Sequence, residues 1–162
     1  MKKFNMKDGF KSKVRQQIER LNNCSYRVIE REVTEKRIAW FRENYHDTDG
    51  PNFWLPRRAY ELLLLEYMGL SEEELPIVVE TKAEIAWLSI NKCPTLEACE
   101  ALGLDTRQVC RAVYEKSTQA FLSQLDPQLR FLRSYEEIRP HTNHCKEMIV
   151  WVDFEEMMAI AV

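Results

Sequence analysis

Glycine and proline are scarce in this chain, with four and six residues among 162. Long disordered linkers are rich in both residue types, so their scarcity argues against such linkers. No apolar run approaches the ~18 residues of a membrane-spanning helix, and even the leucine run Leu62–Leu65 is far too short. Met1, Lys2 and Lys3 lead into polar sequence, where a secretory signal would have an apolar stretch. We therefore expect a cytoplasmic protein with reduced thiols and no membrane association.

Several motifs with well-understood chemistry are also absent. There is no glycine-rich phosphate loop, serine elbow or zinc-protease motif, which disfavours nucleotide-dependent and metalloprotease chemistry. No two cysteines have the Cys-x2-Cys spacing of zinc ribbons and fingers. The net charge is −3, from 23 basic and 26 acidic residues, so no broad positive field would attract nucleic acid. A basic cluster over residues 2–15 indicates a solvated start of a helix.

The composition that is present is that of a globular protein. The chain is 45% hydrophobic, and roughly 70% of the unfolded surface can be buried at this length. We divide it into an N-terminal helical extension, residues 1–50, and an α+β domain, residues 51–162, with the cysteines concentrated in its C-terminal half. A turn-rich stretch of aspartate, threonine, glycine and proline marks the boundary.

The first half of the chain has the apolar spacing of helices. Apolar residues three and four apart predict one helix over 12–24. A second helix is predicted over 25–45, with a short strand within 25–33 as the alternative. Pro56 and Gly69 suit the first turn and the cap of a third helix, which is apolar on most faces and therefore expected to be buried.

The second half of the chain alternates between two periodicities. Apolar residues two apart predict strands over 82–91, 128–136 and 146–153. Between the first two strands, capped helical patterns predict a short helix that stops at Gly103 and a longer one that ends near Leu125. The fold class is therefore α+β: N-terminal helices followed by a small antiparallel sheet of about three strands, with a helix pair packed on one face.

Four of the five cysteines and two of the three histidines lie between Cys93 and Cys145. Cys93, Cys110 and Cys145 each stand near the end of a predicted element, where a pocket could form. His144 precedes Cys145 in the predicted loop 137–145, and long loops carry function more often than short ones. The three thiols either pack as inert core residues, act as nucleophiles or bind a metal.

The two chemical alternatives use the same four residues. In the first, Cys93, Cys110 or Cys145 is a catalytic nucleophile and His144 is its base. In the second, these thiols and His144 hold zinc or iron. Zinc and iron are both possible, but we expect the absence of any cofactor ahead of either metal.

Three further residues are candidates for binding a ligand. Arg107 lies close to Cys110 in sequence and could bind a carboxylate. Arg133 would need a carboxylate partner, or a bound acidic ligand, if it points beneath the helices. Trp87, on the strand that leads to Cys93, is the third candidate.

Short motifs accompany the cysteines through this region. They are Ile90-Asn91-Lys92-Cys93-Pro94, Glu97-Ala98-Cys99, Leu102-Gly103-Leu104, Cys110, Asp126-Pro127 and Cys145. In these motifs the chain resembles, over about residues 57–153, the family of L-2-amino-thiazoline-4-carboxylic acid hydrolases, and above all its uncharacterised relatives. The resemblance implies a small α+β domain with a pocket near the cysteines.

The hydrolases of that family open a cyclic amidine by adding water. The present chain departs from their pattern before the last cysteine, because His141-Thr142-Asn143-His144 stands where a glycine is expected. We therefore expect first a small-molecule-binding domain, a sensor or carrier with a cysteine-lined pocket. The alternatives are a thiol-dependent hydrolase of a non-peptide C–N bond and a metal-binding protein. The partner is a small molecule and not nucleic acid, and the sequence leaves homo-oligomerisation open.

Overall fold

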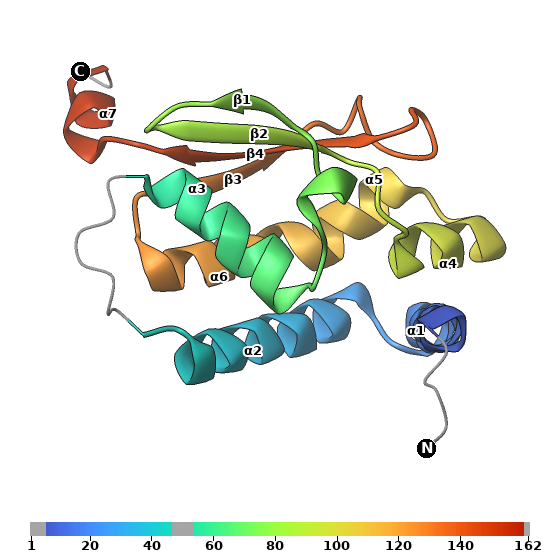
Figure 1. The fold of residues 1–162 in the computed structure, drawn as a ribbon. Helices are drawn as coiled ribbons and strands as arrows, with labels where there is room; N and C mark the ends of the chain where they lie inside the picture. The colour runs from blue at the N-terminus through green and yellow to red at the C-terminus, as the bar shows by residue number, and fades with distance from the viewer. Residues whose placement is uncertain (1–5, 47–53, 161–162) are drawn as a thin grey trace.

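The computed structural model of the protein describes residues 6–46 and 54–160. The fold is α+β, as predicted, with a four-stranded antiparallel sheet and helices gathered on one side of it (Figure 1). The turn-rich stretch, and with it the domain boundary predicted at residue 50, lies outside the described residues. No helix in the described ranges combines enough length with enough apolar character to cross a membrane.

Two long helices open the chain. Helix α1 spans Met6–Asn23 and α2 spans Tyr26–Asn44. Ser25 caps α2, because its side chain accepts a hydrogen bond from the N–H of Val28. The cap decides between the two predictions for residues 25–33: the segment is helical and contains no strand.

The third predicted helix is present but changes its winding. It begins as helix α3, Leu55–Tyr60, and continues as a π-helical segment, η1, over Glu61–Tyr67. A short 3-10 turn, η2, follows at Glu72–Glu74. Gly69, with φ of +69°, ends the π segment in the left-handed conformation that glycine adopts without strain.

The sheet has the strand order β1-β2-β4-β3. Strand β1 spans Ile77–Glu80 and β2 spans Glu84–Ser89. Strand β3 spans Leu129–Arg133 and β4 spans Cys145–Trp151. The prediction of about three strands missed β1. This edge strand is short and mostly exposed, so it lacks the alternation of apolar and polar residues on which the prediction depended.

The helices between β2 and β3 form one winding path. Helix α4 spans Pro94–Leu102 and is followed by α5, Thr106–Val109. Helix α5 continues as a second π-helical segment, η3, over Cys110–Glu115, and then as α6, Lys116–Leu125. The last described helix is α7, Phe154–Ile160. Gly103, with φ of +66°, ends α4 as predicted.

The helices form two layers beneath the sheet. Helices α3 and α6 pack against the sheet, α2 packs on α6, and α1 packs on α4 (Figure 1). Phe121 of α6 lies at the centre, with its ring 5.3 Å from that of Phe41 and 6.0 Å from that of Trp40, both on α2. Helix α2 therefore shares this core with the α+β part of the chain.

Candidate functional site

The inner face of the sheet changes from apolar to polar along its strands. Ile149 pairs with Ile85 and Phe131 on neighbouring strands, and all three side chains are buried. Further along the same face stand a serine, a cysteine and an ion pair, namely Ser89, Cys145, Glu147 and Arg133. Buried polar groups need hydrogen-bonding partners, so this end of the sheet differs from an ordinary core.

A cavity of about 350 Å³ lies between the polar end of the sheet and the helices. Part of its wall is apolar and comprises Leu63, Leu64, Phe131 and Ile138. Lys13 and Met68 also line the cavity and are exposed to solvent. The cavity therefore opens to solvent between α1 and the end of η1.

Both π-helical segments contribute to the wall of the cavity. η1 supplies Leu63 and Leu64, and η3 supplies Cys110 and Tyr114. At the end of η1 the N–H of Met68 donates to the carbonyl of Leu63, which is the hydrogen-bond pattern of a π turn. Such turns are rare and occur frequently at functional sites, which supports this cavity as the candidate site.

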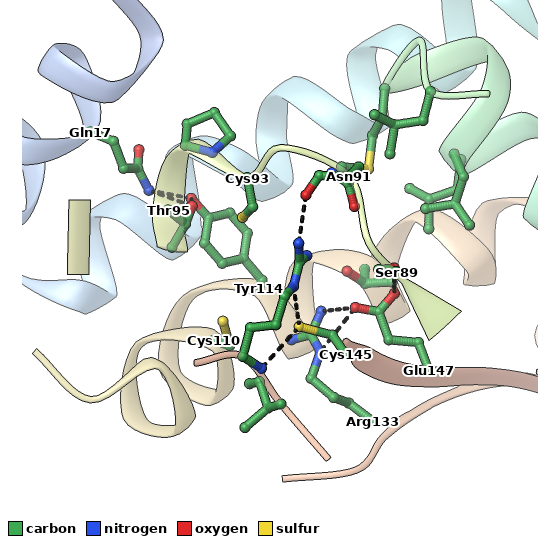
Figure 2. Close-up of a pocket in the computed structure, with 18 of the residues that line it drawn as sticks. Gln17, Ser89, Asn91, Cys93, Thr95, Cys110, Tyr114, Arg133, Cys145 and Glu147 are labelled. Carbon is green, nitrogen blue, oxygen red and sulfur yellow. Dashed lines mark hydrogen bonds and ion pairs between the residues drawn. The ribbon is translucent and has the colours of Figure 1, made fainter. Parts of the chain in front are cut away.

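The three cysteines predicted to surround a pocket all line the cavity. Cys93 lies just before α4, Cys110 begins η3 and Cys145 begins β4. Figure 2 shows their side chains grouped around one part of the cavity, although they come from three separate elements. The fourth cysteine of the cluster, Cys99, is fully buried in a neighbouring apolar cluster.

Cys93 caps helix α4. The Cys93 sulfur accepts a hydrogen bond from the N–H of Leu96 at 3.5 Å. Burial raises the pKa of the Cys93 thiol, although the Leu96 donor and the Arg139 guanidinium act in the opposite direction. Cys93 is therefore a protonated thiol at neutral pH.

Cys110 is also protonated at neutral pH. Burial raises the pKa of its thiol from an ordinary value of 9.0 to about 12, although the Arg133 guanidinium opposes the shift.

We expect iodoacetamide, which reacts with thiolates, to alkylate Cys110 about 1000-fold more slowly in the folded protein than in urea at pH 8. Peptide mass spectrometry over time gives both rates. Rates within tenfold of each other would contradict the raised pKa. A rate that keeps rising above pH 9.0, while circular dichroism shows the protein to be folded, separates the raised pKa from steric protection.

Cys145 has the most polar surroundings of the three thiols. Its sulfur accepts hydrogen bonds from the backbone N–H of Arg139 at 3.4 Å and from Nε of the same residue at 3.3 Å. Nη1 of Arg139 also donates to the carbonyl of Asn91 at 2.5 Å. Arg139 thus joins the loop before β4 to the chain after β2, and directs two donors at one sulfur.

Arg133 and Glu147 form a buried ion pair across β3 and β4. Nη2 of Arg133 lies 3.0 Å from Oε1 of Glu147, and each side chain is only 11% exposed. Burial alone would lower the pKa of Arg133, but the carboxylate of Glu147 raises it above its ordinary value. The pairing satisfies the expectation that a buried Arg133 needs a carboxylate. Its Nη1 is buried without a hydrogen-bond partner among the described residues.

Arg37 of α2 approaches the cavity from the helical side. Its side chain is 7% exposed, and its Nη1 donates to the hydroxyl of Thr118 on α6 at 2.7 Å. The guanidinium also lies over the rings of Tyr67 and Tyr114, at 5.9 and 5.8 Å. Its Nε is buried without a hydrogen-bond partner in the described part of the chain. Burial lowers the pKa of Arg37, and the nearby Arg133 adds to that effect.

A hydrogen-bonded group closes the cavity beneath α1. Nε2 of Gln17 donates to the hydroxyl oxygens of Thr95 and Tyr114, and the Thr95 hydroxyl donates to Tyr114 at 3.2 Å (Figure 2). These residues belong to α1, α4 and η3. The N-terminal segment predicted as an extension therefore forms part of the cavity wall.

Three residues predicted to belong to the site lie elsewhere. His144 contacts Glu137 at 3.2 Å and Asn143, and it is not among the residues that line the cavity. Arg107 forms a bidentate pair with Asp105 on the surface and is not among the residues that line the cavity. These polar side chains find hydrogen-bonding partners close by, which spacing along the sequence did not reveal.

Trp87 is a core residue and does not line the cavity. Its indole is fully buried, packs edge-on against Tyr60 and donates from Nε1 to Ser89 Oγ at 3.1 Å. Through this hydrogen bond it contacts Ser89, which does line the cavity.

The arrangement offers little to a metal ion. Within residues 6–46 and 54–160, no three histidine, cysteine, aspartate or glutamate side chains are placed to hold one. The alternative of a zinc or iron site formed by Cys93, Cys110, Cys145 and His144 stays a prediction: His144 does not line the cavity that the three cysteines line, and its ring nitrogens contact Asn143 and Glu137.

The sequence contained a signal for one residue that the predictions missed. Ile29, Val33, Arg37 and Phe41 are spaced four apart on α2, so an arginine occupies the apolar stripe of that helix. Arg139 carries no such signal, because it lies in a loop whose path depends on the rest of the fold.

Comparison of the chain with protein-family models, with curated proteins and with solved structures finds no match. The resemblance to the hydrolase family stays a prediction, and the candidate function depends on the site itself.

Proposed function

We propose that this protein binds a small molecule in the cavity beneath the polar end of the sheet, and acts as a sensor or carrier domain. The volume of about 350 Å³ is in the range of ligand sites, roughly 300–1,000 Å³. Such sites combine an apolar wall with a few convergent polar groups. Here the apolar wall includes Leu63, Leu64 and Phe131, and the polar groups include the guanidinium groups of Arg37 and Arg133.

The observation that carries the proposal is the gathering of buried charged side chains, Arg37, Arg133 and Glu147, beside the apolar part of one cavity wall. Charged groups are costly to bury. Sites that bind ligands are where proteins commonly place such groups. The cysteines then serve as a soft, compact part of the wall.

Filling the cavity tests the proposal. We expect fragment-sized molecules such as benzoate and benzamide to bind the full chain saturably, as measured by ligand-observed NMR and by thermal stabilisation. Cys110→Phe places a ring in the cavity and should abolish binding. Ala112→Phe is the matched control, because Ala112 is exposed on the same π segment. If neither fragment binds, or if Cys110→Phe binds them as well as the parent, the proposal is wrong.

A thiol-dependent hydrolase of a small cyclic amidine is the second candidate. The two donors from Arg139 to the Cys145 sulfur favour it, because they hold this sulfur in one position on the cavity wall. The resemblance in cysteine placement supports the same idea. Against it, His144 does not line the cavity and therefore offers no base. Ring opening of 2-amino-thiazoline-4-carboxylate by the protein, detected by mass spectrometry and lost in Cys145→Ser, would favour this candidate over simple binding.

A further inference from the structure

One face of the sheet has no helical layer over it. The described helices lie on the inner side of the sheet or, in the case of α7, beyond one end of the strands (Figure 1). Ile85, Phe131 and Ile149 point to the inner side and belong to the core beneath the sheet. The residues next to them along each strand therefore point to the other side. We call that side the outer face.

An apolar row crosses all four strands of the outer face. Ala86 of β2 pairs with Val79 of β1 on one side and with Met148 of β4 on the other. Met148 in turn pairs with Leu132 of β3. Val79 and Leu132, at the two ends of the row, are 39% and 51% exposed. Contiguous exposed apolar side chains mark interaction surfaces, whereas single ones are common on any protein.

The two edges of the sheet are less suited than its face to bind a partner. Gln119 of α6 covers the edge at β3, because its side-chain amide donates to the carbonyl of Leu129 at 2.8 Å and accepts from the N–H of Phe131 at 2.9 Å. At the other edge the register of β1 shifts between Ile77 and Val79, and such bulges hinder the pairing of edge strands. The outer face is therefore the part of the sheet that is open to a partner.

Charged residues lie on both sides of the apolar row. In the direction of α7, the next row of the outer face contains Glu84, Val150 and Arg130. In the opposite direction Leu88 pairs with Lys146. An apolar centre with a polar rim is the usual arrangement of a protein interface.

We propose that two copies of this chain form a homodimer by packing their outer faces together, with a two-fold axis that runs parallel to the strands between β2 and β4. Two copies of one twisted sheet pack in this way at about −30°, as in β-sandwiches. The axis places Val79 of each copy against Leu132 of the other, because β1 and β3 are the two edges of the sheet.

The apolar row fits itself under this axis. The small Ala86 of each copy lies opposite the larger Met148 of the other, which favours close packing. A two-fold axis across the strands would instead place the two Ala86 side chains opposite each other and leave a gap between the sheets. The sizes of the side chains therefore favour the axis parallel to the strands.

Charge and area also agree with a second copy as the partner. The same axis brings Glu84 of each copy toward Arg130 of the other, whereas β4 separates these two residues within one copy. Four strands, the longest of seven residues, form a face of about 20 by 20 Å. Two such faces bury on the order of 1,000 Å² in total, at the low end for specific association, so we expect a dissociation constant on the order of 10 µM.

Sedimentation velocity of the full chain from roughly 1 to 200 µM tests the proposal, and we expect a change from monomer to dimer over this range. Val79→Lys and Leu132→Glu should each raise the dissociation constant at least about tenfold, because each places two unpaired charges in the interface. Ala39→Glu is the matched control. Ala39 is exposed on α2, in the layer of helices far from the outer face, so this variant should dimerise like the parent (Figure 1).

Mixing the two variants tests the arrangement of the copies. The lysine introduced at position 79 of one chain would lie against the glutamate introduced at position 132 of the other, so the mixture should dimerise about tenfold more tightly than either variant alone. Circular dichroism checks that the variants are folded, as expected for changes at exposed sites.

Three results would overturn the proposal. A parent protein that stays monomeric at about 200 µM would leave the outer face to a different protein. Weaker dimerisation of Ala39→Glu than of Leu132→Glu would place the interface on the helices. Absence of any gain on mixing would show that Val79 does not face Leu132. The dimer does not involve the cavity, so these results are independent of ligand binding.

Discussion

Replacing Glu147 with alanine is expected to lower the free energy of unfolding by about 3–5 kcal/mol, because it leaves the Arg133 guanidinium buried without a counter-charge. Both partners are only 11% exposed, so water would replace the lost carboxylate only in part. The measurement is urea unfolding followed by tryptophan fluorescence and circular dichroism.

A double variant is the control for this expectation. Arg133→Met combined with Glu147→Leu removes both charges and keeps the side-chain volume, so its stability should lie close to that of the parent. Comparison of Glu147→Ala with the double variant separates the effect of an unpaired charge on stability from the effect of lost packing. If Glu147→Ala costs less than about 1 kcal/mol, as a surface ion pair would, then the pair is solvated and the account of its burial is wrong.

Replacing Phe121 with alanine should also cost about 3–5 kcal/mol, as truncation of a buried phenylalanine generally does. The effect should spread beyond α6, because the Phe121 ring packs against Trp40 and Phe41 of α2 and against Tyr67 of η1. The sheet and the N-terminal helices should therefore unfold in one transition, at a lower urea concentration than in the parent protein.

Phe154 gives the matched control for Phe121. It is 40% exposed at the start of α7, so Phe154→Ala should change the free energy of unfolding by less than about 1 kcal/mol. A separate early transition of α2 in Phe121→Ala, detected by hydrogen exchange, would contradict a shared core. It would mean instead that the N-terminal helices form a unit of their own.

The fold was predictable where apolar periodicity is strong. The alternation around Trp87 and Ile149 and the helical spacing on α2 correspond to observed elements, because burial of one face determines both patterns. Strand β1 was not predictable in this way. It lies at the edge with Val78 and Val79 exposed, and pairing with β2 holds it in place.

The site was predictable in its cysteines and in Arg133, all of which line the cavity. Cys93, Cys110 and Cys145 stand near element ends, and antiparallel packing brings those ends together. The partners of the buried charges depend on strand register and loop path. Arg133 meets Glu147 because β3 and β4 pair in one particular register, and His144 meets Glu137 because of how the loop folds.

The two π-helical segments have a consequence for comparing this chain with relatives. A π turn holds about one residue more than an α turn, so loss of one residue from η1 or η3 would restore an ordinary helix. Residues beyond the deletion would then rotate by about 100° around the helix axis. A relative could thus keep the sheet, the helices and all three cysteines and still lose the cavity wall formed by Leu64 or Tyr114. Helix length, together with the cysteines, would then identify the chains that share this site.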